Sequence, residues 1–212
     1  MKTRTDLLNF LAEKYNLQRY LEIGVQVPEL NFDKIICPFK TGVDPNPDAK
    51  ATYCMTSDSF FLNMNNDGFE DLQELDENGF DLIFIDGLHT AEQVKKDFDN
   101  ALKVLSPGGF IVLHDCNPLK EEHTIVPRPT ERGHWNGDVW RFAVGFTGYD
   151  HLWRWTVDID NGCTVFWNRS EALNEIVHYG ISEMPWSHFD ANREELLNLI
   201  SWDEFINSHS HV

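Results

Sequence analysis

Residues 80–89, FDLIFIDGLH, include the most apolar short run of the chain and decide its fold class. Four consecutive apolar residues, 82–85, end at Asp86, and Gly87 and His89 follow. A short, nearly continuous apolar run is typical of a strand that is buried on both faces of a parallel sheet. A carboxylate and an imidazole directly after such a strand indicate a functional site at the end of the sheet.

Segments on both sides of this strand alternate between short apolar runs and helical patterns. Strands are also expected at residues 19–25, 40–44, 51–58 and 110–115. Helices are expected at residues 5–16, 28–35, 67–78, 90–105, 137–146, 171–178 and 190–206. This alternation predicts an α/β fold with a mostly parallel, doubly wound sheet and helices on both faces. Residues 151–159 and 162–168 add an antiparallel C-terminal hairpin.

Length and composition predict a single soluble domain over residues 1–212. The chain has 17 basic and 35 acidic residues, so its net charge of −18 disfavours nucleic acid and anionic membranes as partners. It contains no apolar run long enough for a membrane helix, and its N-terminus lacks the apolar core of a signal peptide. The four cysteines are widely spaced, as expected for reduced thiols in a cytoplasmic protein.

Polar or flexible residues stand at the carboxyl end of every expected parallel strand. In open α/β sheets, ligands bind at this edge. The set comprises Gly24, Asp44, Asp58, Asp86, His114 and Asp115. We expect these residues to line one concave site.

Asp44 follows Gly24 by 20 positions (44 − 24), the spacing at which an acidic residue binds ribose hydroxyls in nucleotide sites. The pattern G-x-G-x-x-G is absent, which disfavours a dinucleotide with its pyrophosphate. A nucleoside without phosphates, such as S-adenosylmethionine, fits these residues better. Alternatively, Asp44 begins an Asx-turn before Pro45, and Asp58 caps a helix.

Six motifs occur in the order seen in class I S-adenosylmethionine-dependent methyltransferases: YLEIG, GVDPNP, MTSDSFF, FDLIFIDGLH, LSPGGFIVLHDCNP and WNGDVW. Over residues 19–141 the chain resembles this family, most closely a bacterial group associated with sugar modification. The resemblance implies a Rossmann-like fold, S-adenosylmethionine as the cofactor, and O-methylation of a sugar or small-molecule hydroxyl. Val27 and Pro28 depart from the family pattern, which usually has a second glycine in this stretch.

The resemblance also assigns roles to single residues. It implies that the cofactor is bound by Glu22, Gly24, Asp44, Ser57, Asp58 and Asp86. His89 would be the general base, and His114 and Asp115 would lie beside the acceptor. Because a free imidazole has a pKa of about 6.5, His89 is expected to be neutral and active above that pH.

Asp86, His114 and Asp115 leave three interpretations open. They are acid/base groups, ligands of a divalent metal such as Mg²⁺ or Mn²⁺, or parts of a hydrogen-bonded turn. Residues 117–141 form a long polar segment, which we interpret as a lid that selects the acceptor. Within it, Trp135 and Trp140 are either core residues or a platform for an acceptor sugar.

Two other functions remain open for this sequence. One is a non-catalytic protein of the same fold that binds S-adenosylmethionine or another nucleoside, which the missing second glycine favours. The other is a nicotinamide-dependent oxidoreductase, which the absence of G-x-G-x-x-G and of a Tyr-x-x-x-Lys pair disfavours.

Overall fold

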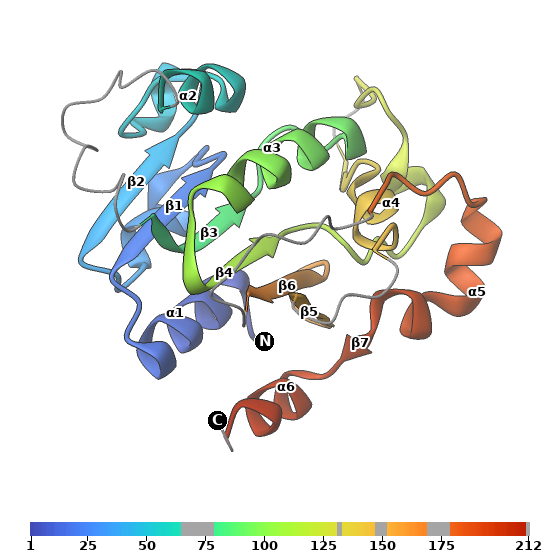
Figure 1. Cartoon of the computed structure of the whole chain (residues 1–212). Coiled ribbons are helices and arrows are strands. Elements are labelled where there is room, and N and C mark those ends of the chain that lie inside the picture. The colour runs from blue at the N-terminus through green and yellow to red at the C-terminus, as the bar shows by residue number, and fades with distance from the viewer. Residues whose placement is uncertain (65–78, 131–132, 147–151, 169–178, 211–212) are drawn as a thin grey trace.

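The computed structural model describes residues 1–64, 79–130, 133–146, 152–168 and 179–210. Its strands are β1 (Arg19–Ile23), β2 (Phe39–Val43), β3 (Phe80–Ile85), β4 (Leu105–Leu113), β5 (Leu152–Val157), β6 (Cys163–Asn168) and β7 (Leu199–Ile200). They form one sheet in the order β2-β1-β3-β4-β6-β5-β7 (Figure 1). β1 to β4 are parallel, and β6 is antiparallel to both β4 and β5. The predicted mostly parallel sheet with an antiparallel hairpin is confirmed.

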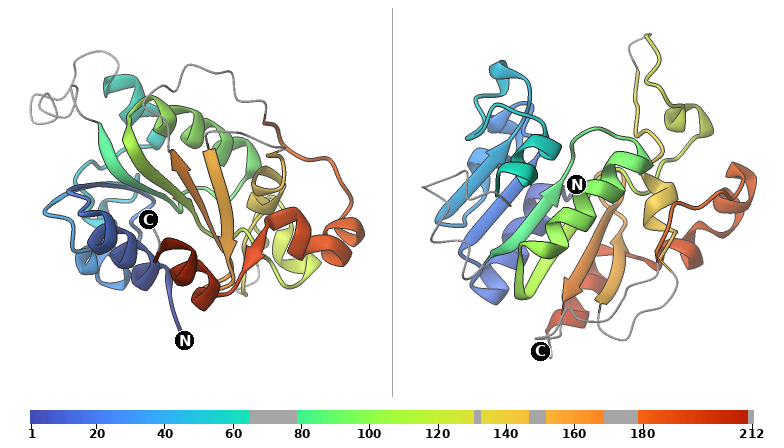
Figure 2. Two further views of the ribbon diagram at one scale, coloured as in Figure 1. Left: turned by 60° about the horizontal axis from the view of Figure 1, so that its bottom comes forward. Right: turned by 45° about the horizontal axis from the view of Figure 1, so that its top comes forward.

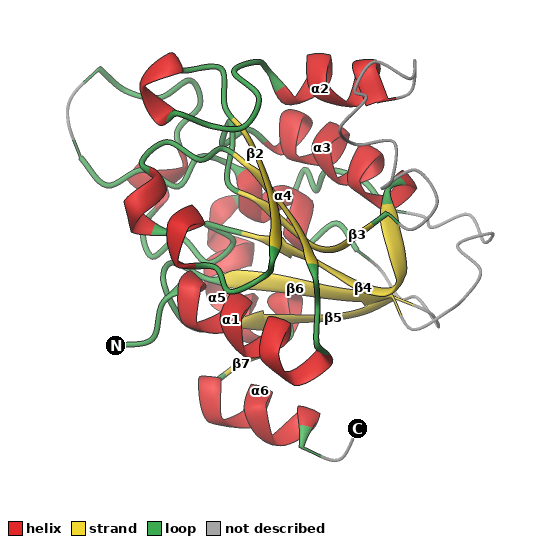
Figure 3. Cartoon of the chain, turned by 90° about the vertical axis from the view of Figure 1, so that its left-hand side faces the viewer, coloured by secondary structure: helices red, strands yellow, loops and turns green. Residues whose placement is uncertain are grey.

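Helices cover both faces of this sheet. They are α1 (Arg4–Tyr15), α2 (Ser57–Met64), α3 (Ala91–Lys103), α4 (Val139–Ala143), α5 (Trp186–Leu197) and α6 (Trp202–His209), with short 3₁₀ turns η1 (Pro28–Leu30), η2 (Phe32–Lys34), η3 (Pro47–Ala49) and η5 (Glu121–Thr124). Figure 3 shows α2 and α3 on one side of the strands and α1 and α6 on the other. None of the helices in the described ranges is long and apolar enough to cross a membrane.

The apolar run of β3 explains why the protein has two hydrophobic core layers, one on each face of the sheet. Ile83 and Ile85 pack in the core beneath α2, α3 and α4, whereas Leu82 and Phe84 pack in the core beneath α1 and α6. Successive side chains of a strand point to opposite faces, so a strand buried on both faces has no polar positions along its interior. Figure 2 shows this sheet enclosed between the helices.

The strand order creates a topological switch point at one edge of the sheet, which we call the crevice. β1 lies between β2 and β3, so the chain leaves β1 toward one side and later continues on the other. Loops that leave β1 and β3 therefore diverge at their carboxyl ends, which is where α/β sheets bind ligands. The residues that follow β1, β2, β3 and β4 meet at this edge.

Several expected elements were wrong. Residues 51–58 do not form a strand: Tyr53 makes a single bridge to Val43, while the Thr52 hydroxyl accepts the Gly42 N–H. Residues 28–35 form the turns η1 and η2 instead of an α-helix. Residues 106–109 belong to β4 although they include Pro107 and two glycines. The expected helices at 67–78 and 171–178 lie outside the described residues.

The C-terminal helix expected at 190–206 is two helices separated by β7. Asn198 adopts the left-handed conformation, with φ of 48°, and ends α5. Ser201 and Glu204 then form a capping box that begins α6. His209 is buried at the end of α6 among aromatic rings.

Candidate functional site

Gly24 and Asp86 bring the ends of β1 and β3 into contact. The Asp86 N–H donates to the Ile23 carbonyl over 2.8 Å. Gly24 has φ of +92°, and a Cβ atom there would lie 2.2 Å from the Asp86 carbonyl oxygen. Only glycine combines this backbone conformation with so close an approach. The crevice therefore depends on Gly24.

Replacing Gly24 with alanine is expected to lower the free energy of unfolding by about 2 kcal/mol or more, because a strained φ adds to a steric clash. Gly108→Ala is the matched control: Gly108 also has positive φ (+76°), but a Cβ atom there would have no heavy atom within 4 Å. Urea unfolding compares the two variants. Equal losses of unfolding free energy in the two variants would show that the steric clash with Asp86 adds no destabilisation.

His89 lies between two carboxylates at the crevice. Its Nε2 is 3.3 Å from Asp86 Oδ1, and its Nδ1 is 2.9 Å from Asp115 Oδ2. The Nδ1 contact has the distance of an ion pair but not the angles of a hydrogen bond. His114 completes the cluster, with Nδ1 3.2 Å from Asp86 Oδ1 and 3.5 Å from Asp115 Oδ1. The structure thus brings together four of the predicted site residues: Asp86, His89, His114 and Asp115.

The carboxylates change the expected charge of His89. Burial alone would lower the pKa of His89, but its contacts with Asp115 and Asp86 outweigh burial and raise the pKa to about 9. These contacts favour a protonated imidazole at pH 7, where the sequence alone predicts a neutral one. Burial alone would also lower the pKa of His114. The carboxylates of Asp86, Asp115 and Asp160 outweigh burial and raise this pKa.

Asp115 reaches His89 because of an unusual backbone conformation. It follows β4 with φ of 59°, a left-handed conformation that is uncommon for aspartate and often found at functional sites. Its Oδ1 accepts a 2.6 Å hydrogen bond from the Asn136 amide. Asn136 is fully buried, and its own Oδ1 has no hydrogen-bond partner.

The segment after β4 returns to His89. The Trp135 ring stacks on the His89 ring, with centroids 5.1 Å apart and planes 3° apart. The Asp138 N–H donates to the His89 carbonyl, and the Asp138 carboxylate accepts the Ala91 N–H at the start of α3. Trp140, by contrast, is buried in the core. Of the two tryptophans, only Trp135 contacts the cluster.

Asp44 is held at the end of β2 by backbone groups. Its Oδ2 accepts the Gln26 N–H over 2.9 Å, and its Oδ1 accepts the Asn46 N–H over 2.7 Å. The second bond is the expected Asx-turn. Each oxygen retains a second lone pair, so a fixed Asp44 can still accept hydroxyl groups.

Ser57 and Asp58 begin α2 and meet α3. The Gln93 amide nitrogen lies 3.4 Å from Ser57 Oγ, 2.9 Å from Asp58 Oδ1 and 3.1 Å from Asp97 Oδ1. Asp97 is almost fully buried. Burial raises the pKa of the Asp97 carboxyl to about 6.

The raised pKa of Asp97 predicts a pH-dependent stability. The native state holds this proton more tightly than the unfolded chain does. The proton's contribution to the free energy of unfolding is therefore complete below about pH 4 and is lost as the pH rises through about 6. The free energy of unfolding of Asp97→Asn should therefore exceed that of wild type by on the order of 2 kcal/mol above about pH 7. Near pH 4 the two proteins should be equally stable. Urea unfolding at both pH values is the measurement. A difference that does not change with pH would contradict the assignment.

Glu22 lies on the α1 side of the sheet. Its Oε2 accepts hydrogen bonds from the Tyr20 hydroxyl (2.6 Å) and the Asn31 amide (3.0 Å). Burial raises the pKa of Glu22 to about 7. These contacts place Glu22 in a polar network with α1 and η1, beside the cluster that contains Asp86.

Sequence reasoning missed Arg4 and Asp160. Arg4 begins α1, and Asp160 lies in the β5–β6 turn with φ of 46°. Their ion pair is 3.3 Å long, and His114 Nε2 lies 3.4 Å from Arg4 Nη1 and 3.8 Å from Asp160 Oδ2. No local sequence pattern predicts a contact between residues 110 positions apart. The only signal in the sequence is the turn-forming run Asp-Asn-Gly at 160–162, whose three residues all have positive φ in the structure.

The donor chemistry of the cluster fits a divalent cation. Asp86, His114 and Asp115 each offer one ligand atom, and these atoms lie within 4.8 Å of one another. Carboxylate and imidazole ligands suit Mg²⁺, Mn²⁺ and related ions.

Residues 39–116 match the family model of a methyltransferase domain. The resemblance to methyltransferases is thereby confirmed for the segment that runs from β2 to the end of β4. This segment contains Asp44, Ser57, Asp58 and the four residues of the cluster.

Solved structures with a similar fold include three methyltransferases. An SAH-bound methyltransferase from Podospora anserina is 19% identical, with 80% of each chain covered and a TM-score of 0.48. An O-methyltransferase from Streptomyces achromogenes in complex with SAM is 18% identical over 77% of this chain and 78% of that one (TM-score 0.47). One from Bacillus cereus in complex with SAH is 16% identical over 76% and 79% (TM-score 0.45). No curated protein matches the sequence.

Proposed function

We propose that this chain is an S-adenosylmethionine-dependent methyltransferase that methylates a hydroxyl group of a small molecule, with sugars as the first class to test. One observation carries the proposal. Asp86, His89, His114 and Asp115 converge at the crevice beside Gly24, within the segment that matches a methyltransferase domain. We further propose one domain over residues 1–212, with residues 117–141 as the acceptor lid.

The cofactor would lie along the ends of β1, β2 and β3. Asp44 would accept the ribose hydroxyls, since backbone N–H groups already fix its carboxylate. Ser57 and Asp58 would contact the adenine, and Glu22 and Gly24 would lie at the methionine end. When bound, S-adenosylmethionine supplies a methyl group on a sulfonium, which is readily lost to a nucleophile.

His89 would then accept the proton of the acceptor hydroxyl. It can do so only after its own extra proton has left, and the contacts with Asp115 and Asp86 hold that proton. Asp86, His114 and Asp115 would hold a divalent cation, which neutralises these carboxylates and polarises the hydroxyl. Binding and alignment of donor and acceptor supply the remaining rate enhancement.

Asp44→Ala is expected to weaken S-adenosylmethionine binding at least tenfold, or about 1.4 kcal/mol, because two charge-assisted hydrogen bonds are lost. Asp48→Ala, at an exposed position four residues further on, is the matched control. Isothermal calorimetry gives both dissociation constants. An unchanged affinity of the Asp44 variant would remove this residue from the cofactor site.

A thermal-shift comparison separates the proposed function from its alternatives. S-adenosylmethionine and S-adenosylhomocysteine should raise the melting temperature and NAD should not, since a ligand stabilises the native state that binds it. A shift with NAD alone would favour an oxidoreductase. No shift with either adenosyl compound would contradict the proposal.

A non-catalytic binding protein is the second candidate. Both histidines of the cluster are paired with carboxylates, and each Asp44 oxygen already accepts a backbone N–H. A protein of this kind would bind S-adenosylmethionine without forming S-adenosylhomocysteine. Product analysis therefore distinguishes it from the enzyme.

A further inference from the structure

The first turn of α1 reaches the cluster from the opposite side to the loop that carries Trp135. Arg4 Nη1 lies 3.3 Å from Asp160 Oδ2 and 3.4 Å from His114 Nε2. Arg4 Nε lies 4.0 Å from Asp86 Oδ2. One guanidinium thus contacts two members of the cluster and the carboxylate behind them.

Arg4 and His114 compete for the same carboxylate oxygen. Asp160 Oδ2 is 3.3 Å from Arg4 Nη1 but 3.8 Å from His114 Nε2. Because the guanidinium is always charged and donates from several N–H groups, it takes this oxygen. The shortest polar contact of the His114 ring is therefore the one from Nδ1 to Asp86, at 3.2 Å, while Nε2 faces Arg4 Nη1 at 3.4 Å.

The contact between α1 and the β5–β6 turn does not depend on the guanidinium. The backbone N–H of Arg4 donates to Asp160 Oδ2 over 3.0 Å, and Thr3 and Asp6 form a capping box at the start of the helix. Removing the side chain therefore leaves the helix and the turn connected. The guanidinium can be tested separately from the fold.

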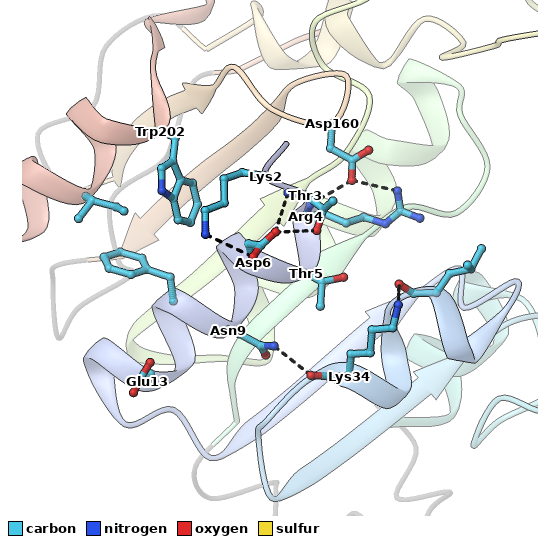
Figure 4. Close-up of a pocket in the computed structure, with 13 residues that line it drawn as sticks. Lys2, Thr3, Arg4, Thr5, Asp6, Asn9, Glu13, Lys34, Asp160 and Trp202 are labelled. Atoms are coloured by element: carbon cyan, nitrogen blue, oxygen red, sulfur yellow. Dashed lines mark hydrogen bonds and ion pairs between the residues drawn. The ribbon is translucent and has the colours of Figure 1, made fainter.

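Arg4 is also open to solvent from the side away from the cluster. It lines, with Asp160, a cavity of about 770 Å³ between α1, α6 and the η1–η2 turns. Figure 4 shows the Arg4 side chain extended toward Asp160 at one side of this cavity. A small cation in solution can therefore reach the place of the guanidinium.

We propose that Arg4 is a positioning residue that holds Asp160 and thereby keeps the His114 ring directed at Asp86. The effect on turnover rests on the proposed function, but the effect on His114 does not. Without the guanidinium, the His114 ring should shift so that Nε2 closes the 3.8 Å gap to Asp160, and the 3.2 Å contact of Nδ1 with Asp86 should lengthen. Arg4→Ala should then lower kcat by at least tenfold, with little change in the KM for S-adenosylmethionine.

The test uses the ring-nitrogen NMR shifts of His114, measured without cofactor or acceptor and assigned with a His114→Gln variant. We expect Arg4→Ala to move these shifts and dilute guanidinium chloride, below unfolding concentrations, to restore them. Arg19→Ala is the matched control, because Arg19 forms a similar partly buried ion pair with Asp81 at the opposite end of β1. It should leave His114 unchanged.

Unchanged His114 shifts in a folded Arg4→Ala protein would overturn the inference. Should that variant fail to fold, Arg4→Lys is the second variant, because it retains the charge but has a single donor nitrogen. We expect Arg4→Lys to move the His114 shifts partway. Unchanged shifts in Arg4→Lys would also overturn the inference. A wild-type protein with no methyl transfer would refute the proposed function alone. Moved shifts that guanidinium does not restore would show that helix packing, and not the guanidinium, positions His114.

Discussion

Replacing His89 with alanine is expected to lower kcat by about 10²–10⁴-fold, the usual contribution of a general base. His89 lies within 3.3 Å of both Asp86 and Asp115, so the lost group is the one that these carboxylates orient. The affinity for S-adenosylmethionine should change little, because we propose that Asp44 and the ends of β1 and β2 bind the cofactor. Steady-state kinetics and calorimetry measure the two quantities.

His188→Ala is the control for this variant. His188 is exposed on α5 and has no contact with the cluster among the described residues, so its kcat should remain at the wild-type value. A near-native kcat for His89→Ala would remove the base assignment. His89 would then be a residue that shapes the entrance to α3 beneath Trp135.

Removing divalent metal with EDTA is expected to abolish turnover, and added Mg²⁺ or Mn²⁺ should restore it. The reason is the donor set of Asp86, His114 and Asp115, whose ligand atoms lie within 4.8 Å of one another. Because His114 must lose its Nδ1 proton to become a ligand, metal binding should also release protons, which calorimetry in buffers of different ionisation enthalpy detects.

Asp115→Ala should mimic the effect of EDTA, and added metal should not restore its turnover. Asp190→Ala, at an exposed site on α5, provides the control. Full activity of wild type in the presence of EDTA would contradict the metal site. The cluster would then serve through its acid/base groups alone.

The parallel core of the fold was predictable because its strands are buried on both faces. Residues 82–85 of β3 and 110–113 of β4 are apolar at consecutive positions, and a helix pattern follows β3. Residues 51–58 were misassigned because β-branched and aromatic residues favour a strand, yet a single bridge from Tyr53 to Val43 forms. The break at Asn198 depends on a left-handed residue that helical periodicity does not reveal.

The grouping of the candidate residues at strand ends was predictable, and most of their contacts were not. Strand ends in a parallel sheet share one edge, so Asp86, His114 and Asp115 had to meet. Arg4 and Asp160 arrive from α1 and the β5–β6 turn, and tertiary packing alone determines that contact. The charge of His89 likewise depends on distances to two carboxylates, which set its pKa near 9 rather than at the value of a free imidazole.

The most direct test of the central claim is to incubate the protein with S-adenosylmethionine whose methyl group carries deuterium, together with a small-molecule extract of the organism that encodes it. Mass spectrometry then follows the label. We predict a hydroxyl compound that gains the labelled methyl group, with S-adenosylhomocysteine formed in equal amount. Both products should form about 10²–10⁴-fold more slowly with His89→Ala. Binding of S-adenosylmethionine without any labelled product would contradict the methyltransferase assignment and support the non-catalytic alternative.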